Sequence, residues 1–432
     1  MQRTMNAHLT QNHTFYFAID QSFRTDNRAS NRLFILFVII LSHLTNESRS
    51  FSLLPKQPVG LSREKIAQLA RKRFYRENNT NVETPMKEKV VVITGASGGI
   101  ASQLCKVMYS LGATVIALDR NTIGLNQLQK QLTNDKVNEN SRIITFTTHH
   151  EDLNSVRNVA NEIMSKYPKI DVLVNNAGLS YSRDDTIPGS PSTISAHGND
   201  LAFTVNYLSH FLLTTKLLPN LSKAKGRIVH VTSTYHWQVS GSELLPSLGD
   251  PIAFKSNPKD QSSKHVERSY ANTKLAQIWH SNALLCNNDV DCSSVCACPT
   301  WAATGIAGEQ SRTFLQKYAF PTENCGPGIT STINAILRTD DELGDALNNG
   351  KSFVANSRII EYLWGIEKLL PFAQIFGLRD FLSDMLAVVL LIGQRFTYDE
   401  FIIQRTSPES YNDQESRNIF YRWSLKAVEP WL

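Results

Sequence analysis

The sequence has little excess charge of either sign and no long block of basic residues. Its 432 residues carry a formal net charge of +5, with 41% hydrophobic and 19% charged residues. A surface that follows nucleic acid phosphates needs clustered Lys and Arg, so we expect no nucleic acid partner. The apolar content is sufficient for a packed core, and the low charge argues against a largely disordered chain.

Cysteine is also scarce. The six cysteines are too few and too dispersed for the disulfide framework of a small secreted protein, so we expect free thiols. Cys292, Cys296 and Cys298 lie close together, but they lack the Cys-x-x-Cys spacing of zinc sites and occupy an apolar run that predicts a strand. No metal site is predicted.

No apolar run reaches the ~20 residues that span a bilayer as a helix. The run from Leu33 to Leu44 follows a polar, flexible arm (1–32) and predicts a membrane anchor, with a segment packed on the core or a cleaved signal peptide as alternatives. We therefore expect a membrane-associated protein of the endoplasmic reticulum. Basic residues on both sides of the run leave the membrane face undetermined.

Residues 45–86 are expected to form a linker. Leu61 to Arg76 has the pattern of a basic amphipathic helix, which could lie on an anionic membrane or form a plain solvated linker. Asn78 to Pro85 is rich in turn formers and marks the boundary of the main domain.

From residue 87 onward, apolar strands alternate with helical periods, which is typical of a parallel sheet wrapped by helices. We predict an α/β doubly wound parallel sheet of Rossmann type in a single domain over 87–356. Residues 357–406 form an apolar insertion, and 407–432 contain a C-terminal helix of the same domain. The six predicted strands are Lys89–Thr94, Ala113–Leu118, Arg142–Thr147, Ile170–Val174, Arg227–Val231 and Val290–Ala297.

A glycine-rich turn follows the first predicted strand. Its small residues let a pyrophosphate approach the backbone, and amides of the next helix stabilise its charge. The residues expected to contact a dinucleotide there are Thr94, Gly95, Ser97, Gly99 and Ile100. Asp119 ends the second strand, where a carboxylate binds ribose hydroxyls and repels a 2′-phosphate. We therefore expect NAD as cofactor, although Arg120 could reverse this preference toward NADP.

Tyr270 and Lys274 are four residues apart and so share one face of a helix. A nearby cation favours the phenolate, which a tyrosine needs in order to exchange a proton with substrate near neutral pH. Ser233 ends the fifth predicted strand, where its hydroxyl could hold a substrate oxygen against Tyr270. These residues predict a proton-transfer centre.

Taken in order, these motifs resemble the short-chain dehydrogenase/reductase family from about Lys87 to Arg338, and again near the C-terminus. The matching elements are the Thr94-Gly95-x-x-x-Gly99 turn, the Asn175–Gly178 turn and the Tyr270-x-x-x-Lys274 pair. The glycine-rich turn also fits the longer, epimerase-like branch through Gly98 and Ala101, whereas the later motifs favour the shorter branch.

The resemblance implies further roles. Asn206 corresponds to the family's fourth catalytic residue, which holds a water in the proton path, and Lys274 would also bind the nicotinamide ribose. Ala101 and Thr300 depart from family glycines, which puts the local turns in question. The remaining implied cofactor contacts are Asp152 and Leu153 at the adenine, Asn176, Ala177 and Gly178 beside the cofactor, Tyr270, and Pro299 and Thr304 near the carboxamide.

Residues 203–214 resemble those of retinol-dehydrogenase-like members. Together with the apolar runs of the insertion, such as Met385 to Gly393, they favour an oxidoreductase that interconverts an alcohol and a carbonyl on a small lipophilic substrate: a retinoid, a steroid or a fatty aldehyde. The alternative is a catalytically silent nucleotide-binding sensor or scaffold. A homo-oligomer is compatible with either.

Overall fold

The computed structural model describes residues 60–75, 84–134, 141–180, 195–245, 263–285, 291–299, 302, 306, 327–348, 351–357, 398–411 and 413–432. These residues fall within one compact unit of the chain, which comprises Gln57–Trp364 and Leu391–Leu432. The predicted N-terminal arm and apolar run, residues 1–44, lie outside the described residues.

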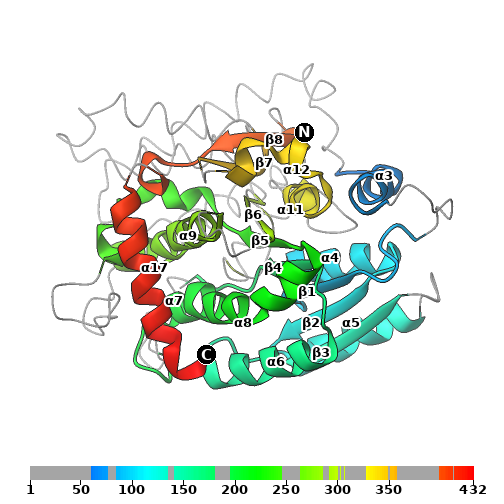
Figure 1. The fold of residues 1–432 in the computed structure, drawn as a ribbon, viewed down its shortest axis with the longest axis horizontal. Helices are drawn as coiled ribbons and strands as arrows, with labels where there is room; N and C mark the ends of the chain where they lie inside the picture. The colour runs from blue at the N-terminus through cyan, green and yellow to red at the C-terminus, as the bar shows by residue number, and fades with distance from the viewer. Residues whose placement is uncertain are drawn as a thin grey trace, which may run out of the picture. The chain divides into compact units, whose positions relative to one another are not determined.

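An eight-stranded sheet forms the centre of this unit, in the order β3-β2-β1-β4-β5-β6-β7-β8 (Figure 1). The strands pair in parallel except for the last, which runs antiparallel to β7. Their bounds are β1 Val90–Thr94, β2 Thr114–Asp119, β3 Arg142–Thr147, β4 Val172–Asn175, β5 Arg227–Val231, β6 Ser293–Ala297, β7 Ser352–Ser357 and β8 Tyr398–Arg405.

Helices cover both faces of the sheet. One face carries α3 Arg63–Phe74, α4 Gly99–Ser110, α5 Thr122–Asn134 and α11 Pro327–Leu337. The other face carries α6 Leu153–Lys166, α7 Leu201–Phe203, α8 Ser209–Ala224, α9 Ser263–Leu285 and α17 Gln414–Val428. Short elements complete the described fold: a π-helix Thr204–Leu208, 3-10 turns Thr234–Gln238, Ser242–Leu244, Pro408–Ser410 and Glu429–Trp431, and helices α12 Asp340–Leu343 and α13 Asp345–Asn348.

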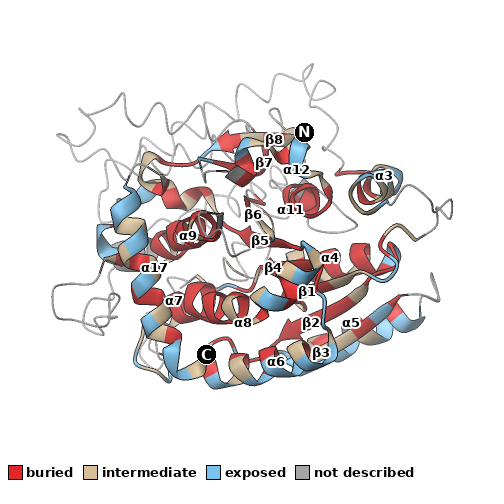
Figure 2. Ribbon diagram, in the orientation of Figure 1, coloured by how far each residue is buried: buried red, intermediate tan, exposed pale blue. Residues whose placement is uncertain are grey.

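The strand sequences explain this sandwich of three layers. Successive side chains of a strand point to opposite faces, so the β1 residues Val91 and Ile93 join one core cluster and Val92 joins the other. Because both faces are covered, the inner strands β1, β2, β4 and β5 are largely apolar rather than alternating. Figure 2 shows the buried residues along the sheet and on the inner sides of the helices.

A parallel doubly wound sheet is therefore confirmed, and the six predicted strands are present with shifts of a few residues at their ends. Gly112, with a φ of +98°, follows α4 and allows the chain to turn back into β2. Two strands, β7 and β8, were not predicted. Since β8 lies inside the predicted insertion 357–406, that insertion ends earlier than expected, and its last residues belong to the sheet.

The predicted basic helix is α3, and its apolar side packs on the core. Ile66, Leu69 and Ala70 are buried, and α3 lies against α11. Basic side chains on its other faces pair with acidic residues of the domain: Lys65 with Glu400, Lys72 with Glu342 and Arg73 with Asp340. The apolar face is thus used inside the protein. Among the described residues, no helix combines the length and apolar character needed to cross a bilayer.

Candidate functional site

The strand order reverses between β1 and β4, which are neighbours in the sheet. The connections from these two strands leave toward opposite faces, and such a switch point opens a crevice at the carboxyl ends of the strands. The glycine-rich turn after β1 and the Asn175–Gly178 turn after β4 lie at this edge. The structure therefore brings together the two turns that the sequence assigned to the cofactor.

Thr94 joins these two turns. Its Oγ1 accepts hydrogen bonds from the backbone amides of Asn176, at 2.9 Å, and Ala177, at 2.8 Å. The Nδ1 of His210 faces the carbonyl oxygen of Asn206 at 3.0 Å and must carry the ring proton, because a carbonyl only accepts. Its Nε2 is then an acceptor, and the Thr94 hydroxyl donates to it at 2.9 Å. The buried hydroxyl fixes the geometry of both turns.

The glycine-rich turn packs closely on itself and on the turn after β4. Gly95 has a φ of +67°, and a Cβ added there would lie 2.9 Å from the Cα of Ala177. A Cβ on Gly98 would lie 3.1 Å from the carbonyl oxygen of Gly95. Helix α4 starts at Gly99 directly after this turn, and the first amides of a helix are available to bind an anion such as a pyrophosphate. Ala101, which replaces a family glycine, is fully buried in the helix, and the turn before it keeps its form.

Asp119 ends β2 as predicted, and its carboxylate is held in place by its neighbours. One oxygen accepts from the amide and the hydroxyl of Ser97, both at 2.9 Å, and the other accepts from the amide of Asn121 at 2.9 Å. Arg120 is exposed next to it. A fixed carboxylate beside the glycine-rich turn suits the hydroxyls of a ribose.

Three elements carry the four predicted catalytic residues. Tyr270 and Lys274 lie one turn apart on α9, Ser233 caps the 3-10 turn after β5, and Asn206 lies in the π-helix between α7 and α8. The Lys274 ammonium lies 5.3 Å from the centre of the Tyr270 ring. Single π turns within helices often mark functional sites.

The sequence predicted that the Lys274 cation favours the phenolate of Tyr270, but burial acts on the pKa values of both side chains in the direction of their neutral forms. Burial raises the pKa of the Tyr270 phenol, while a hydrogen bond with the Ser233 side chain acts in the opposite direction. Burial lowers the pKa of the Lys274 ammonium to about 8. Its Nζ donates to the carbonyl oxygen of Val231 at 2.9 Å. Lys274 is therefore beside the phenol, yet its hydrogen bonds go elsewhere.

The side chain of Asn206 is fully satisfied. Its Oδ1 accepts from the amide of Leu179 at 2.8 Å, and its Nδ2 donates to the carbonyl oxygen of Leu179 at 2.9 Å and to Oγ1 of Thr273 at 3.1 Å. Gly178 permits this approach, since a Cβ there would lie 3.3 Å from Oδ1 of Asn206. The π-helix is thus clamped to the β4 turn on one side and to α9 on the other.

Asp152 and Leu153, which were expected to contact the adenine, lie at the start of α6. Asp152 is the N-cap of α6, with its side chain accepting from the amide of Asn154 at 2.9 Å, and Leu153 is fully buried. The amide of Leu153 donates to the ring of His197 at 3.0 Å. The residues that directly follow β3 are Thr148 and His149, so the adenine contact of Asp152 and Leu153 stays a prediction. Pro299 follows β6 as expected, whereas Thr300 and Thr304 lie outside the described residues.

Five buried histidines surround the site. Burial lowers the pKa of His150 and His236 to about 4 and that of His280 to about 3, and it holds the pKa values of His210 and His230 well below 6.5. Their neutral rings pack between the sheet and its helices, with His150 against His210 and His230 against His280. The structure thus gives His210, His230 and His236 structural positions.

These histidines predict acid lability. Their folded pKa values lie below the unfolded value, so the unfolded chain binds more protons, and stability is lost as the pH falls below about 6.5. Each ring contributes up to about 1.4 kcal/mol per pH unit until its folded pKa is reached. Urea unfolding at pH 7.5, 6.0 and 5.0 should show this loss. His280→Leu should reduce the slope of the free energy of unfolding against pH by up to the equivalent of one bound proton, about 1.4 kcal/mol per pH unit. A flat profile in both proteins would contradict this assignment.

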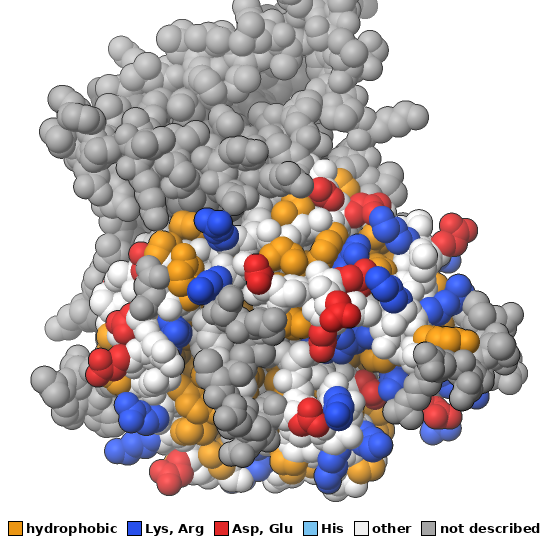
Figure 3. Space-filling view, turned by 45° about the horizontal axis from the view of Figure 1, so that its top comes forward, with side chains coloured by type: hydrophobic (Ala, Val, Ile, Leu, Met, Phe, Trp, Pro, Cys, Tyr) orange, Lys and Arg blue, Asp and Glu red, His pale blue; other side chains and the backbone are white. Residues whose placement is uncertain are grey.

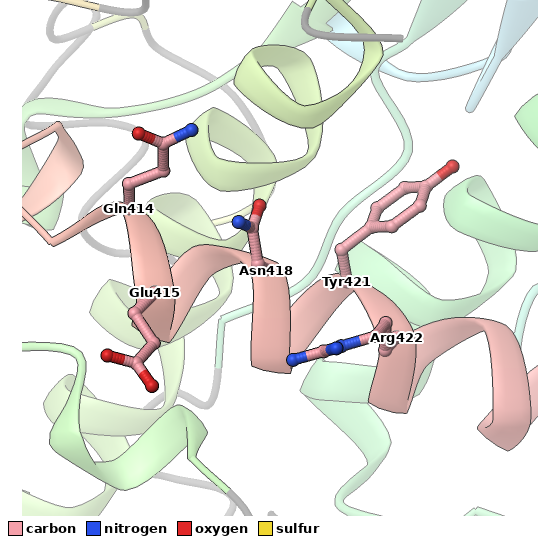
Figure 4. Close-up of a pocket in the computed structure, with 5 residues that line it drawn as sticks. All are labelled: Gln414, Glu415, Asn418, Tyr421 and Arg422. Carbon is pink, nitrogen blue, oxygen red and sulfur yellow. The ribbon is translucent and has the colours of Figure 1, made fainter.

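A cavity of about 510 Å³ lies along α17, away from the predicted catalytic residues. Gln414, Glu415, Asn418, Tyr421 and Arg422 line it, all from one helix (Figure 4). None of the four predicted catalytic residues borders it. We therefore do not assign it to the substrate.

The family model of the short chain dehydrogenases matches residues 89–242, from the start of β1 through the turn that follows Ser233. This part of the chain is therefore similar to the short chain dehydrogenases. A crystal structure of an uncharacterized protein from Mycobacterium paratuberculosis has a TM-score of 0.50, covers 79% of this chain and 94% of that one, and is 18% identical. This likeness supports the fold alone.

Several curated proteins show more sequence likeness. Human retinol dehydrogenase 12 is 32% identical over 158 residues, covering 36% of this chain and 46% of that protein. An uncharacterized oxidoreductase of Schizosaccharomyces pombe is 32% identical over 204 residues (45% and 55%), and the chloroplastic short-chain dehydrogenase TIC 32 A of Brassica napus is 28% identical over 205 residues (46% and 58%). The chain thus spans about half the length of the curated relatives that it matches.

Proposed function

We propose that this protein is an NAD(P)-dependent oxidoreductase that interconverts an alcohol and a carbonyl. The observation that carries the proposal is the proximity of Tyr270 to Lys274 and Ser233, with Asn206 hydrogen-bonded to Thr273 of the same helix, in a sheet whose strand order reverses between β1 and β4. A phenol and an ammonium alone occur by chance on many helices. Their position next to a turn of the dinucleotide-binding type supports a catalytic role for both residues.

Each residue has a distinct task in this proposal. Tyr270 transfers the proton to or from the substrate oxygen, and Ser233, hydrogen-bonded to the same phenol, holds that oxygen in place. Lys274 supplies positive charge beside the ring and would hold the nicotinamide ribose. Gly95, Asp119 and the Asn176–Gly178 turn would hold the rest of the dinucleotide. When bound, the nicotinamide supplies the hydride donor or acceptor.

The substrate that we propose is small and lipophilic: a retinoid, a steroid or a fatty aldehyde. The support is the likeness to retinol dehydrogenase 12 and the apolar sequence of 358–397, which lies outside the described residues. A turnover screen with both cofactors should detect activity on these substrates and little on sugars. Nucleotide binding without turnover of any substrate would instead indicate the silent sensor or scaffold.

For the cofactor, we propose a preference for NAD(H) over NADP(H). The Asp119 carboxylate would repel a 2′-phosphate, and hydrogen bonds to charged groups are worth enough to give a difference of about 10- to 100-fold in kcat/KM. Asp119→Ala should narrow this gap, and Arg120→Ala, at the exposed neighbour, should leave it or widen it. An unmodified enzyme that prefers NADP(H) would show that Arg120 outweighs Asp119.

Membrane association remains a proposal, supported by the apolar sequence runs Leu33 to Leu44 and Met385 to Gly393. On the face shown in Figure 3, charges of both signs are interspersed with apolar side chains. If the N-terminal run is the anchor, a protein starting at Lys56 should move from the membrane to the soluble fraction. Recovery of the intact full-length protein in the soluble fraction would contradict the proposal.

A further inference from the structure

One buried amide joins two of the four site residues. Gln277 lies on α9 one turn after Lys274 and is 1% exposed. Its Oε1 accepts from the Lys274 ammonium at 3.3 Å, and its Nε2 donates to the carbonyl oxygen of Asn206 at 2.9 Å. Lysine only donates and a carbonyl only accepts, so these partners fix which end of the amide faces which.

The Asn206 carbonyl that Gln277 contacts also accepts a second side-chain hydrogen bond. The carbonyl of Asn206 accepts from two side chains, Gln277 and His210, and it lies within the π-helix. On the same residue, the side-chain amide reaches Thr273 of α9. Gln277 therefore closes a ring of contacts between α9 and the π-helix that includes Lys274.

We propose that Gln277 is a positioning residue that holds the Lys274 ammonium and the Asn206 carbonyl in a fixed relation. This inference rests on the proposed function, because Lys274 matters for catalysis only if the dinucleotide reaction takes place. An amide suits this position because it offers an acceptor to the cation and a donor to the carbonyl without adding charge. A carboxylate would face the carbonyl with a second acceptor, and an apolar side chain would leave both partners short of one hydrogen bond.

Two substitutions of similar size separate these possibilities. Gln277→Met removes an acceptor from a buried ammonium, so the Lys274 pKa should fall, by about one unit. Gln277→Glu places a negative charge there, so the pKa should rise. The basic limb of kcat/KM should therefore move to lower pH in the Met variant and to higher pH in the Glu variant. We expect kcat/KM at neutral pH to fall about tenfold in Gln277→Met.

The same limb should be visible without turnover, in fluorescence titrations of NADH and NADPH binding across pH. The matched control is Gln404→Met, because Gln404 is also buried and donates to a backbone carbonyl, that of Ser357, on β7. This control should change stability and leave both pH limbs in place.

A third measurement keeps the inference independent of the proposed function. In the free protein, the pH titration of Lys274, followed through the NMR signal of its 13C-labelled Cε, should shift in opposite directions in the two Gln277 variants. Equal limbs in the native protein and both folded variants would overturn the inference and show that Gln277 only packs. Opposite shifts in a protein that turns over no substrate would retain the inference about position and reject the proposed function.

Discussion

Replacing Tyr270 with Phe should lower kcat by about 10²- to 10⁴-fold, because the substitution removes the proton donor and acceptor and little else. The affinity for NADH should be nearly unchanged. Steady-state kinetics and a fluorescence titration of the nucleotide measure the two effects separately.

Tyr235 provides the matched control. Its ring packs edge-to-face against that of Tyr270, with the ring centres 5.7 Å apart. Tyr235→Phe keeps this packing and should have a much smaller effect on kcat. If Tyr270→Phe retains substantial activity, another group must transfer the proton, and the assignment of the catalytic centre fails.

Replacing Arg227 with Met should unfold much of the protein at moderate denaturant, with a loss of about 3–5 kcal/mol in the free energy of unfolding. Arg227 begins β5 and is fully buried. It donates to the carbonyls of Ala335 at 3.0 Å and Ile336 at 3.3 Å, and it pairs with Asp340. The guanidinium thus caps the end of α11, where unpaired carbonyls and the helix dipole both favour a cation.

Burial lowers the pKa of Arg227 to about 10, so the guanidinium stays charged near neutral pH. In Arg227→Met, its partners therefore lose a full cation. Arg338→Met is the control, because Arg338 is partly exposed and packs over the ring of Phe401 at 4.0 Å. We expect this control to lose about 1 kcal/mol. Urea unfolding measures both variants, and equal losses would show that the α11 cap contributes little.

The sequence predicted the parallel sheet because its inner strands are apolar on both faces. The edge of the sheet lacked this signal. Strand β7 contains Ser352, Asn356 and Ser357, polar residues that become buried only through contacts with distant segments. Strand β8 follows a strongly apolar run, and its own sequence is only partly apolar. Pairing of these two strands with each other decides their structure.

For the site, spacing predicted Tyr270 and Lys274, and strand ends predicted Ser233 and Asp119. The sequence could not predict the hydrogen bonds that position them. The contact from Lys274 to Val231 depends on how α9 lies over β5, and the role of Gln277 depends on the π-helix around Asn206. Asp152 illustrates the reverse problem, since one acidic residue near a strand end can equally well cap the following helix.

The most direct test of the central claim is to follow the hydride itself. The purified protein is incubated with an aldehyde substrate from the turnover screen and with NADH or NADPH carrying deuterium at both C4 positions, and the alcohol is analysed by mass spectrometry. We expect one deuterium on the carbinol carbon of the product, and none with Tyr270→Phe over the same period. Alcohol formed without deuterium, or equal transfer in the variant, would contradict hydride transfer at this centre.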